Sequence, residues 1–329
     1  MALADTLAAA WYGKGTAPWW TAPLAGLYGG VTRLRRRLYR SGLLSSVRLP
    51  VPVLVVGNVS VGGTGKTPLT IALAEALRAR GFRPGVVSRG YGGTEQGPLL
   101  LGDKPDPARF GDEPCLIHMA GTPVAVGRDR PAAARLLVDA GCDVILADDG
   151  LQHYRLRRDV EICVIDGARR FGNRRLLPAG PLREPLARLD EVDFRVCNGG
   201  SAEAGEVPMR LEGGTARALR DGVTQSLDAF RGQRVHAVAG IGNPERFFDD
   251  LRARGIEVVP HPFPDHHAYV SGELDFGDGA AVLMTEKDAV KCAAFAPPPS
   301  WAVPVRAVLP DAFFDAVAAK LAAARRGSG

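Results

Sequence analysis

The chain has 329 residues, of which 46% are hydrophobic and 23% are charged. This composition is typical of a folded globular protein and excludes disorder over most of the chain. The length exceeds what one hydrophobic core usually supports, so we expect two domains. The formal net charge of +5 is located in the first fifty residues, which hold seven Lys or Arg and one Asp. The remaining chain is therefore close to neutral, which argues against broad nucleic-acid binding.

The cysteine pattern and the hydropathy indicate in which cell compartment the protein lies. Five cysteines are widely spaced, and no pair has the CxxC spacing typical of metal or redox sites. We interpret them as reduced core residues of a cytosolic protein. No run of about 20 apolar residues and no signal-peptide pattern occurs, so we predict that the protein neither spans a membrane nor is exported. The sequence implies no protein partner.

Residues 1–40 combine apolar and aromatic residues with a cluster of arginines. Apolar residues from Leu24 to Leu38 recur at steps of three and four, which predicts an amphipathic helix after Pro23. Aromatic rings and arginines suit a bilayer interface, where rings lie at headgroup depth and guanidinium groups meet anionic phosphates. A helix that packs its apolar face on the protein core would show the same pattern. Three of the four tryptophans lie in the first 20 residues, which favours a membrane-associating segment.

A glycine-rich loop lies between a short apolar strand at 52–56 and a helix that we expect from Pro68. Its residues are Ser60, Val61, Gly62, Gly63, Thr64, Gly65, Lys66 and Thr67. In such a loop, backbone N–H groups and Lys66 bind the phosphates of a nucleoside triphosphate, and the Thr67 hydroxyl ligates Mg²⁺. The usual pattern begins with Gly, where this chain has Ser60, and a glycine turn with a solvated lysine is the alternative. We predict a binding site for ATP and Mg²⁺.

Further apolar strands, expected at 85–88, 123–126 and 144–147, each end at a loop rich in polar residues. Strands that alternate with helices predict an α/β fold with a doubly wound, mostly parallel sheet of the P-loop NTPase type. Ligands of such sheets gather at the carboxyl ends of the strands, so we expect these loops to face one crevice. The polar residues that follow the three strands are Arg89, Tyr91, Arg130, Asp148 and Asp149.

Several acidic residues and one histidine are candidates for the chemistry. Asp148 and Asp149 end a strand as a Walker B acid does, which predicts Mg²⁺ ligands, although two acids in an ordinary turn would look the same. Asp112 begins a helical run, where it is an N-cap or a base that orients a hydroxyl nucleophile. His266 lies in a loop, where a histidine is a general base or is simply exposed. No histidine pattern with metal spacing accompanies it, so we assign no zinc.

Eight motifs follow one another along the chain: VGNVSVGGTGKTP, VVSRGYGG, GDEP, ADDGLQHYRL, VIDGARRFGNRRLLPAGPLREPL, AGIGNPERFF, FPDHH and MTEKDAVKC. Together they closely resemble the tetraacyldisaccharide 4′-kinase family of lipid A biosynthesis, from about Trp11 to Cys292. The resemblance implies transfer of the ATP γ-phosphate to the 4′-hydroxyl of a tetraacylated glucosamine disaccharide 1-phosphate. It also implies a peripheral position at the cytoplasmic face of a bacterial inner membrane.

The resemblance assigns a role to each of the matching residues. It implies that Lys66 and Thr67 belong to the nucleotide loop, and that Asp148 and Asp149 are the magnesium-associated acids. The catalytic residues that it implies are Asp112 as base, His266 as its assistant, and Lys66. The residues that it implies near the glycolipid substrate are Arg89, Tyr91, Arg130, Arg183 and Glu184. Two arginines of this set, Arg89 and Arg130, suit the 1-phosphate, a dianion that guanidinium groups bind with bidentate geometry.

We expect four parts of the chain. They are a membrane-associating segment at 1–40, a P-loop kinase domain at 41–205, a glycine-rich linker region at 206–230, and a smaller C-terminal α/β domain at 231–329 that brings His266 over the nucleotide. The motif Thr285-Glu286-Lys287-Asp288 is either a nucleotide-base contact or a helix cap. Two other functions share the loop and the acids: another phosphate-loop enzyme, such as a ligase or a GTPase-like chaperone, and a non-catalytic switch that docks on membranes.

Overall fold

The larger of two β-sheets contains nine strands in the computed structural model, which describes residues 3–13, 15–297 and 299–326. Their order is β15-β8-β7-β6-β1-β5-β2-β4-β3, and all neighbours pair in parallel except the two edge strands, β15 and β3. This confirms the predicted mostly parallel α/β sheet. The strands are β1 (Val53–Gly57), β2 (Pro84–Ser88), β3 (Leu99–Leu100), β4 (Val124–Val126), β5 (Val144–Ala147), β6 (Val160–Asp166), β7 (Phe194–Asn198), β8 (Glu206–Glu212) and β15 (Arg306–Val308).

Helices cover both faces of this sheet because its central strands are apolar on both sides. In β1, Leu54 and Val56 pack on one face, with α3 and α9, while Val53 and Val55 pack on the other face, with α6. The helices of this lobe are α3 (Lys66–Ala79), α4 (Pro107–Phe110), α5 (Asp112–Met119), α6 (Arg130–Asp139) and α9 (Asp311–Arg326). The phosphate-binding loop follows β1 in the middle of the sheet, where ligands of this fold bind.

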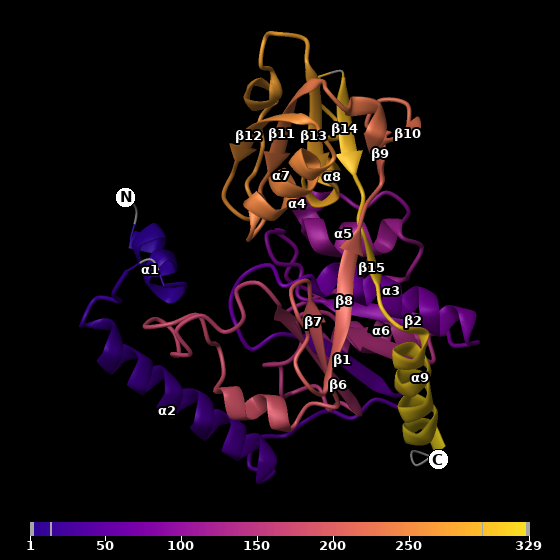
Figure 1. Cartoon of the computed structure of the whole chain (residues 1–329). Helices are drawn as coiled ribbons and strands as arrows, with labels where there is room; N and C mark the ends of the chain where they lie inside the picture. The colour runs from indigo at the N-terminus through magenta and orange to yellow at the C-terminus, as the bar shows by residue number, and fades with distance from the viewer. Residues whose placement is uncertain (1–2, 14, 298, 327–329) are drawn as a thin grey trace.

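The smaller sheet forms a second lobe above the carboxyl ends of the first (Figure 1). Its order is β10-β9-β14-β13-β11-β12, in which the last four strands are parallel and β9 and β10 are antiparallel additions. Its elements are β9 (Thr215–Ala218), β10 (Thr224–Ser226), β11 (Arg234–Ala239), α7 (Pro244–Ala253), β12 (Glu257–Pro262), β13 (Ala281–Thr285), α8 (Glu286–Cys292) and β14 (Ser300–Val303). This lobe therefore has its own sheet and its own core.

The division of the chain differs from the expected one at two places. The range 206–230, expected as a linker, contains β8, which extends the larger sheet, and β9 and β10, which belong to the smaller one. The chain then returns to the first lobe through β15, which pairs with β8 between the lobes (Figure 1). Helix α9 follows and buries Phe313, Val317 and Leu321 in the core of the larger sheet. The residues after β14 thus belong to the first lobe, because the apolar face of α9 packs against the larger sheet.

The N-terminal helices α1 (Leu3–Trp11) and α2 (Thr21–Arg40) lie along one side of the first lobe (Figure 1). The indole nitrogen of Trp11 donates to the carbonyl of Pro178 at 3.0 Å, and Arg40 forms an ion pair with Glu191 at 3.0 Å. In the described part of the chain, every helix is too short or too polar to cross a bilayer. The segment 174–191 contacts both helices, through Pro178 for α1 and through Glu191 for α2, and so connects them to the body of the protein.

Candidate active site

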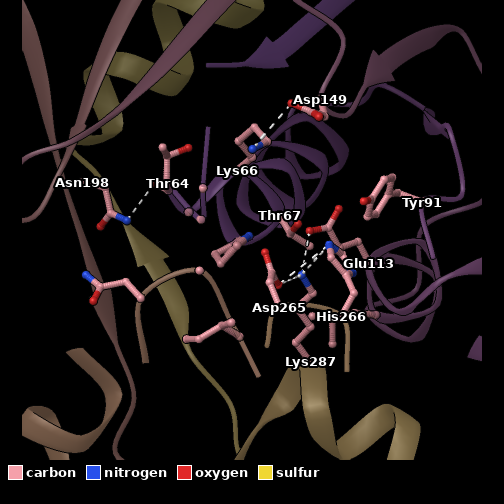
Figure 2. A pocket seen from close by; sticks show the side chains of 18 of the residues that line it. Thr64, Lys66, Thr67, Tyr91, Glu113, Asp149, Asn198, Asp265, His266 and Lys287 are labelled. Carbon is pink, nitrogen blue, oxygen red and sulfur yellow. Dashed lines mark hydrogen bonds and ion pairs between the residues drawn. The ribbon is translucent and has the colours of Figure 1, made fainter. Parts of the chain in front are cut away.

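A cavity of about 840 Å³ lies between the two lobes. Most of the predicted site residues line it, and they come from both lobes. Figure 2 shows Lys66 pointing toward Asp149, with His266, Asp265 and Lys287 gathered beside Glu113. The predicted residues in the lining are Gly62, Gly63, Thr64, Gly65, Lys66, Thr67, Arg89, Tyr91, Arg130, Asp149, Arg183 and His266. The lining does not include Ser60, Val61, Asp112, Asp148 and Glu184, which are buried except for the partly exposed Val61.

Two asparagines beside the phosphate-binding loop fix its conformation. Gly65 has φ of 89°, and a Cβ atom there would lie 2.4 Å from the side-chain nitrogen of Asn198, so only glycine fits. Asn198 donates to the carbonyl of Thr64 at 2.9 Å, and Asn58 donates to the Thr64 hydroxyl at 3.3 Å. The N-terminus of α3 follows at once, so its free N–H groups and its dipole favour an anion in the cavity.

The first two residues of the loop connect it to a neighbouring segment. Ser60 is buried and pairs with Leu182 in an antiparallel bridge, while Val61 N–H donates to the carbonyl of Pro181 at 2.8 Å. The backbone at the start of the loop therefore holds it against the segment that carries Arg183. Sequence reasoning missed the two asparagines, because an isolated asparagine at a strand end carries no pattern.

Asp149 is held by three cations at the carboxyl end of β5. The nearest atoms of Lys66 and Arg183 lie 3.5 and 3.1 Å from its carboxylate, and Arg130 donates to its carbonyl at 2.9 Å. Burial raises the pKa of Asp149, but Lys66, Arg183 and Arg130 outweigh it and hold that pKa well below its usual range. The residue also has φ of 46°, in the left-handed region that non-glycine residues rarely adopt. Asp149 is thus an ionised carboxylate in a fixed position.

Asp148, which directly precedes Asp149 in the sequence, has the opposite environment. It is buried, and one carboxyl oxygen accepts from the Thr70 hydroxyl at 3.0 Å. The other carboxyl oxygen has no hydrogen-bond partner among the described residues. Burial and the nearby Glu113 raise the pKa of Asp148 to about 7, against the effect of Lys66. Within the described part of the chain, the buried carboxylate of Asp148 thus has no ion-pair partner to compensate its negative charge, and a bound metal ion would supply that compensation.

Asp112 and His266 meet across the two lobes. Nδ1 of His266 lies 3.1 Å from Oδ2 of Asp112, which is the first residue of α5. Gly111 is the N-cap of that helix, and the Asp112 side chain makes no capping bond beyond the adjacent N–H of Glu113, at 2.8 Å. Capping therefore does not account for this carboxylate. Burial raises the pKa of Asp112, but His266 and two lysines lower it overall, while Asp112 raises the pKa of His266 against the effect of burial.

Close backbone packing brings the Arg89 to Gly93 loop onto the same site. A Cβ atom on Gly111 would lie 2.5 Å from the carbonyl oxygen of Tyr91, and one on Gly93 would lie 2.4 Å from that of Arg109. Tyr91 is 64% exposed, and its ring lies edge-on to the His266 ring with centroids 4.8 Å apart. The two motifs, far apart in sequence, thus form one wall that contacts the histidine.

Lys287 belongs to the motif at 285–288, for which the sequence left open a nucleotide-base contact or a helix cap, and the lysine itself was assigned no role. Thr285 caps α8 by accepting from Asp288 N–H. Its Nζ lies 3.1 Å from Glu113 Oε1, 3.1 Å from Asp265 Oδ1 and 3.4 Å from His266 Nε2. The neighbouring Asp288 is fully buried, shares a hydrogen bond with the Thr285 hydroxyl, and accepts from Gly240 N–H at 2.8 Å. Asp288 therefore supports the loop instead of facing the cavity. The sequence did contain one indication that this motif belongs to the site, namely that it follows a parallel strand, β13, as the other site loops follow theirs.

Glu184 lies outside the cavity, unlike its neighbour Arg183. It is 4% exposed, accepts from Gln152 at 3.1 Å, and is bonded to the Tyr154 hydroxyl. A carboxylate in that place anchors the chain beside Arg183 and does not reach a ligand directly. Arg169, which was not predicted, joins the two lobes by donating to the carbonyls of Gly63 and Gly242 at 3.3 and 3.0 Å.

Replacing His153 with Gln is expected to weaken the loss of stability in acid. Burial, together with Arg130 and Arg158, lowers the pKa of His153 to about 3. An unfolded chain takes up that proton near pH 6.5, so the native state loses stability as the pH falls from 6.5 toward 3, by about 1 kcal/mol per pH unit. Thermal unfolding of both proteins between pH 7 and 4.5 measures the difference. Equal slopes of Tm against pH would exclude His153 as the cause.

The fold and the loop together define a phosphate-loop α/β protein with a cavity between its two lobes. Proteins of this class use such a loop to bind the phosphates of a nucleoside triphosphate. The family of Tetraacyldisaccharide-1-P 4′-kinase matches residues 17–322 of the chain. A tetraacyldisaccharide 4′-kinase of Stenotrophomonas maltophilia is 56% identical over 94% of this chain and 95% of its own, and one of Azoarcus is 55% identical over 90% of each. The chain therefore belongs to the tetraacyldisaccharide 4′-kinase family, the kinases of lipid A biosynthesis.

A solved structure agrees with this assignment. LpxK from Aquifex aeolicus, crystallised in complex with ATP, matches with a TM-score of 0.75 and 29% sequence identity. The match covers 91% of this chain and 98% of that one, so it includes both lobes. The resemblance of the motifs to this family is thereby confirmed.

Proposed function

We propose that this kinase transfers the γ-phosphoryl group of ATP to the 4′-hydroxyl of a tetraacylated glucosamine disaccharide 1-phosphate, with Asp112 as base. One observation carries the proposal: the Asp112 and His266 pair closes at 3.1 Å beside the cavity that the phosphate-binding loop lines. ATP as the donor is supported by the ATP complex of the Aquifex relative. The acceptor is supported by the names of the relatives.

The nucleotide end of the cavity suits a triphosphate. The α3 N-terminus and Lys66 supply positive potential where the β- and γ-phosphates would lie. The oxygen atoms of Thr67, Asp148 and Asp149 fit Mg²⁺, which prefers hard oxygen ligands and is usually held by one or two carboxylates plus substrate phosphates. The unpartnered buried oxygen of Asp148 is the observation that supports this fit. A bound Mg²⁺ would neutralise charge on the phosphates.

At the acceptor end, we assign proton transfer to Asp112. The 4′-hydroxyl oxygen forms a bond to the γ-phosphorus, the bond from that phosphorus to the β,γ-bridging oxygen breaks, and ADP leaves. The hydroxyl proton passes to Asp112, which His266 orients through Nδ1. Arg89 lines the cavity near Tyr91 and is available for the 1-phosphate, whereas Arg130 is buried and bonded to Asp149. Most of the rate enhancement then comes from positioning and charge, as in other phosphoryl transfers.

Incubation with radiolabelled ATP and a tetraacylated disaccharide 1-phosphate tests the proposed function. A labelled lipid, absent when the acceptor carries no free 4′-hydroxyl, is the expected product. Release of labelled phosphate without a labelled lipid would overturn the proposal and favour a nucleotide-dependent switch. Nucleotide binding without either product would favour another phosphate-loop enzyme with a different acceptor.

The exposed apolar face of α2 supports our proposal that the protein associates peripherally with the membrane. Leu24, Leu27, Val31 and Leu34 are 46%, 67%, 56% and 59% exposed, so the described part of the protein leaves this face uncovered. A run of arginines, Arg33, Arg35, Arg36, Arg37 and Arg40, flanks it. Apolar residues and arginines on one helix suit insertion at the headgroup level of an anionic bilayer. We place the protein at the cytoplasmic face, where ATP is available.

Replacing both Leu27 and Leu34 with Asp is expected to lower binding to anionic vesicles by about tenfold or more, because two exposed apolar side chains that would enter the bilayer become charged. Co-sedimentation with phosphatidylglycerol vesicles measures the bound fraction. Val223, which is 55% exposed in the second lobe, offers a matched control in Val223→Asp. The same loss in both variants would mean that added charge, and not the α2 face, sets the affinity.

A further inference from the structure

The immediate surroundings of His266 come from three segments of the chain. Nδ1 faces Asp112 of α5, and Nε2 faces Lys287 of α8 at 3.4 Å. Asp265 lies 3.8 Å from Nε2, and Tyr91 covers one edge of the ring. His266 itself has φ of 61°, a left-handed conformation that is strained for a residue other than glycine. The protein therefore holds this imidazole in one orientation at the expense of backbone strain.

The hydrogen-bonding capacity of Lys287 matches its neighbours one to one. An ammonium group has three N–H donors and no acceptor. Three acceptors lie within 3.4 Å of Nζ: a carboxylate oxygen of Glu113, a carboxylate oxygen of Asp265, and Nε2 of His266. Nε2 can take part only through its lone pair, so the proton of a neutral His266 is on Nδ1. That proton then points at Asp112.

We propose that Lys287 is a positioning residue that fixes the single proton of His266 on Nδ1, directed at Asp112, by donating to Nε2. The effect of this tautomer on catalysis rests on the proposed function. The tautomer itself does not, because it is a property of the protein without substrate. A neutral imidazole that donates to Asp112 orients the carboxylate and leaves it free to take the hydroxyl proton. A doubly protonated imidazole would hold Asp112 in an ion pair and make it a poorer base.

Removing the ammonium group changes which charges face the imidazole. Asp112 lies at Nδ1, Asp265 and Glu113 lie on the Nε2 side, and Lys291 lies 3.9 Å from the Asp112 carboxylate. Without Lys287, the carboxylates of Asp265 and Glu113 lose their cation and favour a second proton on His266. The acidic limb of the pH profile of kcat/KM is therefore expected to move to higher pH, by roughly one unit.

The test uses the full-length Lys287→Met variant, in which the side chain stays unbranched and flexible but loses its charge and its N–H donors. Nitrogen NMR of ¹⁵N-histidine-labelled protein at pH 8, with His266→Gln to assign the signal, reports which ring nitrogen carries the proton. Wild-type protein is expected to show a proton on Nδ1 and a lone pair on Nε2. In Lys287→Met, the Nε2 signal is expected to shift toward the protonated form, and Lys287→Arg to restore the wild-type signal.

Kinetics at a series of pH values separate this role from a structural one. Lys287→Met is expected to lower kcat/KM below pH 8 and to recover as the pH rises. Lys320→Met removes a surface lysine that pairs with Asp193 at 2.7 Å, and it should leave the profile unchanged. A protonated Nε2 in the wild type, or an acidic limb that does not move in Lys287→Met, would overturn the inference. Failure of the wild type to phosphorylate the lipid would overturn the proposed function alone, since the NMR result does not depend on it.

Discussion

Replacing Asp112 with Asn is expected to lower the rate of phosphoryl transfer by a factor of about 10³, while the Kd of ATP stays within about threefold of wild type. An amide has the shape of the carboxylate and keeps an oxygen for the hydrogen bond from His266 Nδ1. It cannot accept the proton of the sugar hydroxyl. Among the described residues, the hydrogen bonds and ion pairs of Asp112 are with Glu113, His266, Lys287 and Lys291, which lie outside the phosphate-binding loop. ATP affinity should therefore change little.

Single-turnover formation of labelled lipid, together with equilibrium binding of ATP, measures the two effects separately. Asp106→Asn is a suitable control, because Asp106 caps the nearby helix α4 by accepting from Ala108 N–H at 2.9 Å. Asparagine also caps helices, so this variant should keep wild-type turnover. If Asp112→Asn lost ATP binding together with turnover, Asp112 would belong to the nucleotide site and would not be the base.

The larger sheet could be predicted because its central strands are short, apolar and β-branched, and because each ends at a polar loop. In β1 every residue is buried, as the run of valine and leucine indicates. The carboxyl ends of parallel strands meet at one edge, so the joint position of Lys66, Asp149 and Arg130 followed from the pattern alone. Local sequence was sufficient wherever a residue and its strand lie within a few positions of each other.

The connection between the lobes could not be predicted in the same way. Strands β8 and β15 are nearly a hundred residues apart, and their pairing depends on how the second lobe returns the chain. Their side chains are partly exposed, so β8 shows weak periodicity and resembled a linker. The different environments of Asp148 and Asp149 were also invisible, since the cations beside Asp149 come from segments distant in sequence. Likewise, Lys287 meets Glu113 only through the contact of two lobes.

Replacing Lys66 with Met is expected to reduce kcat/KM for ATP by a factor of about 10³ or more, because a cation that meets the charge of the transferring group is lost. The loss should include weaker ATP binding, since Lys66 lines the cavity at the start of α3. Asp149 should keep its place through Arg183 at 3.1 Å, so the variant should fold. Lys104→Met, at an exposed position, serves as the control.

The double variant Asp112→Asn, Lys66→Met distinguishes two explanations of these losses. If Asp112 and Lys66 act together on the same transition state, the second substitution lowers the rate by a smaller factor in the double variant than it does alone. The reason is that a reaction without its base gains less from a correctly positioned phosphate. If they act independently, their effects on the rate multiply. We expect the first outcome, measured as single-turnover rates at saturating ATP. A fully multiplicative loss would contradict this expectation and indicate that Asp112 and Lys66 contribute to the rate independently of each other.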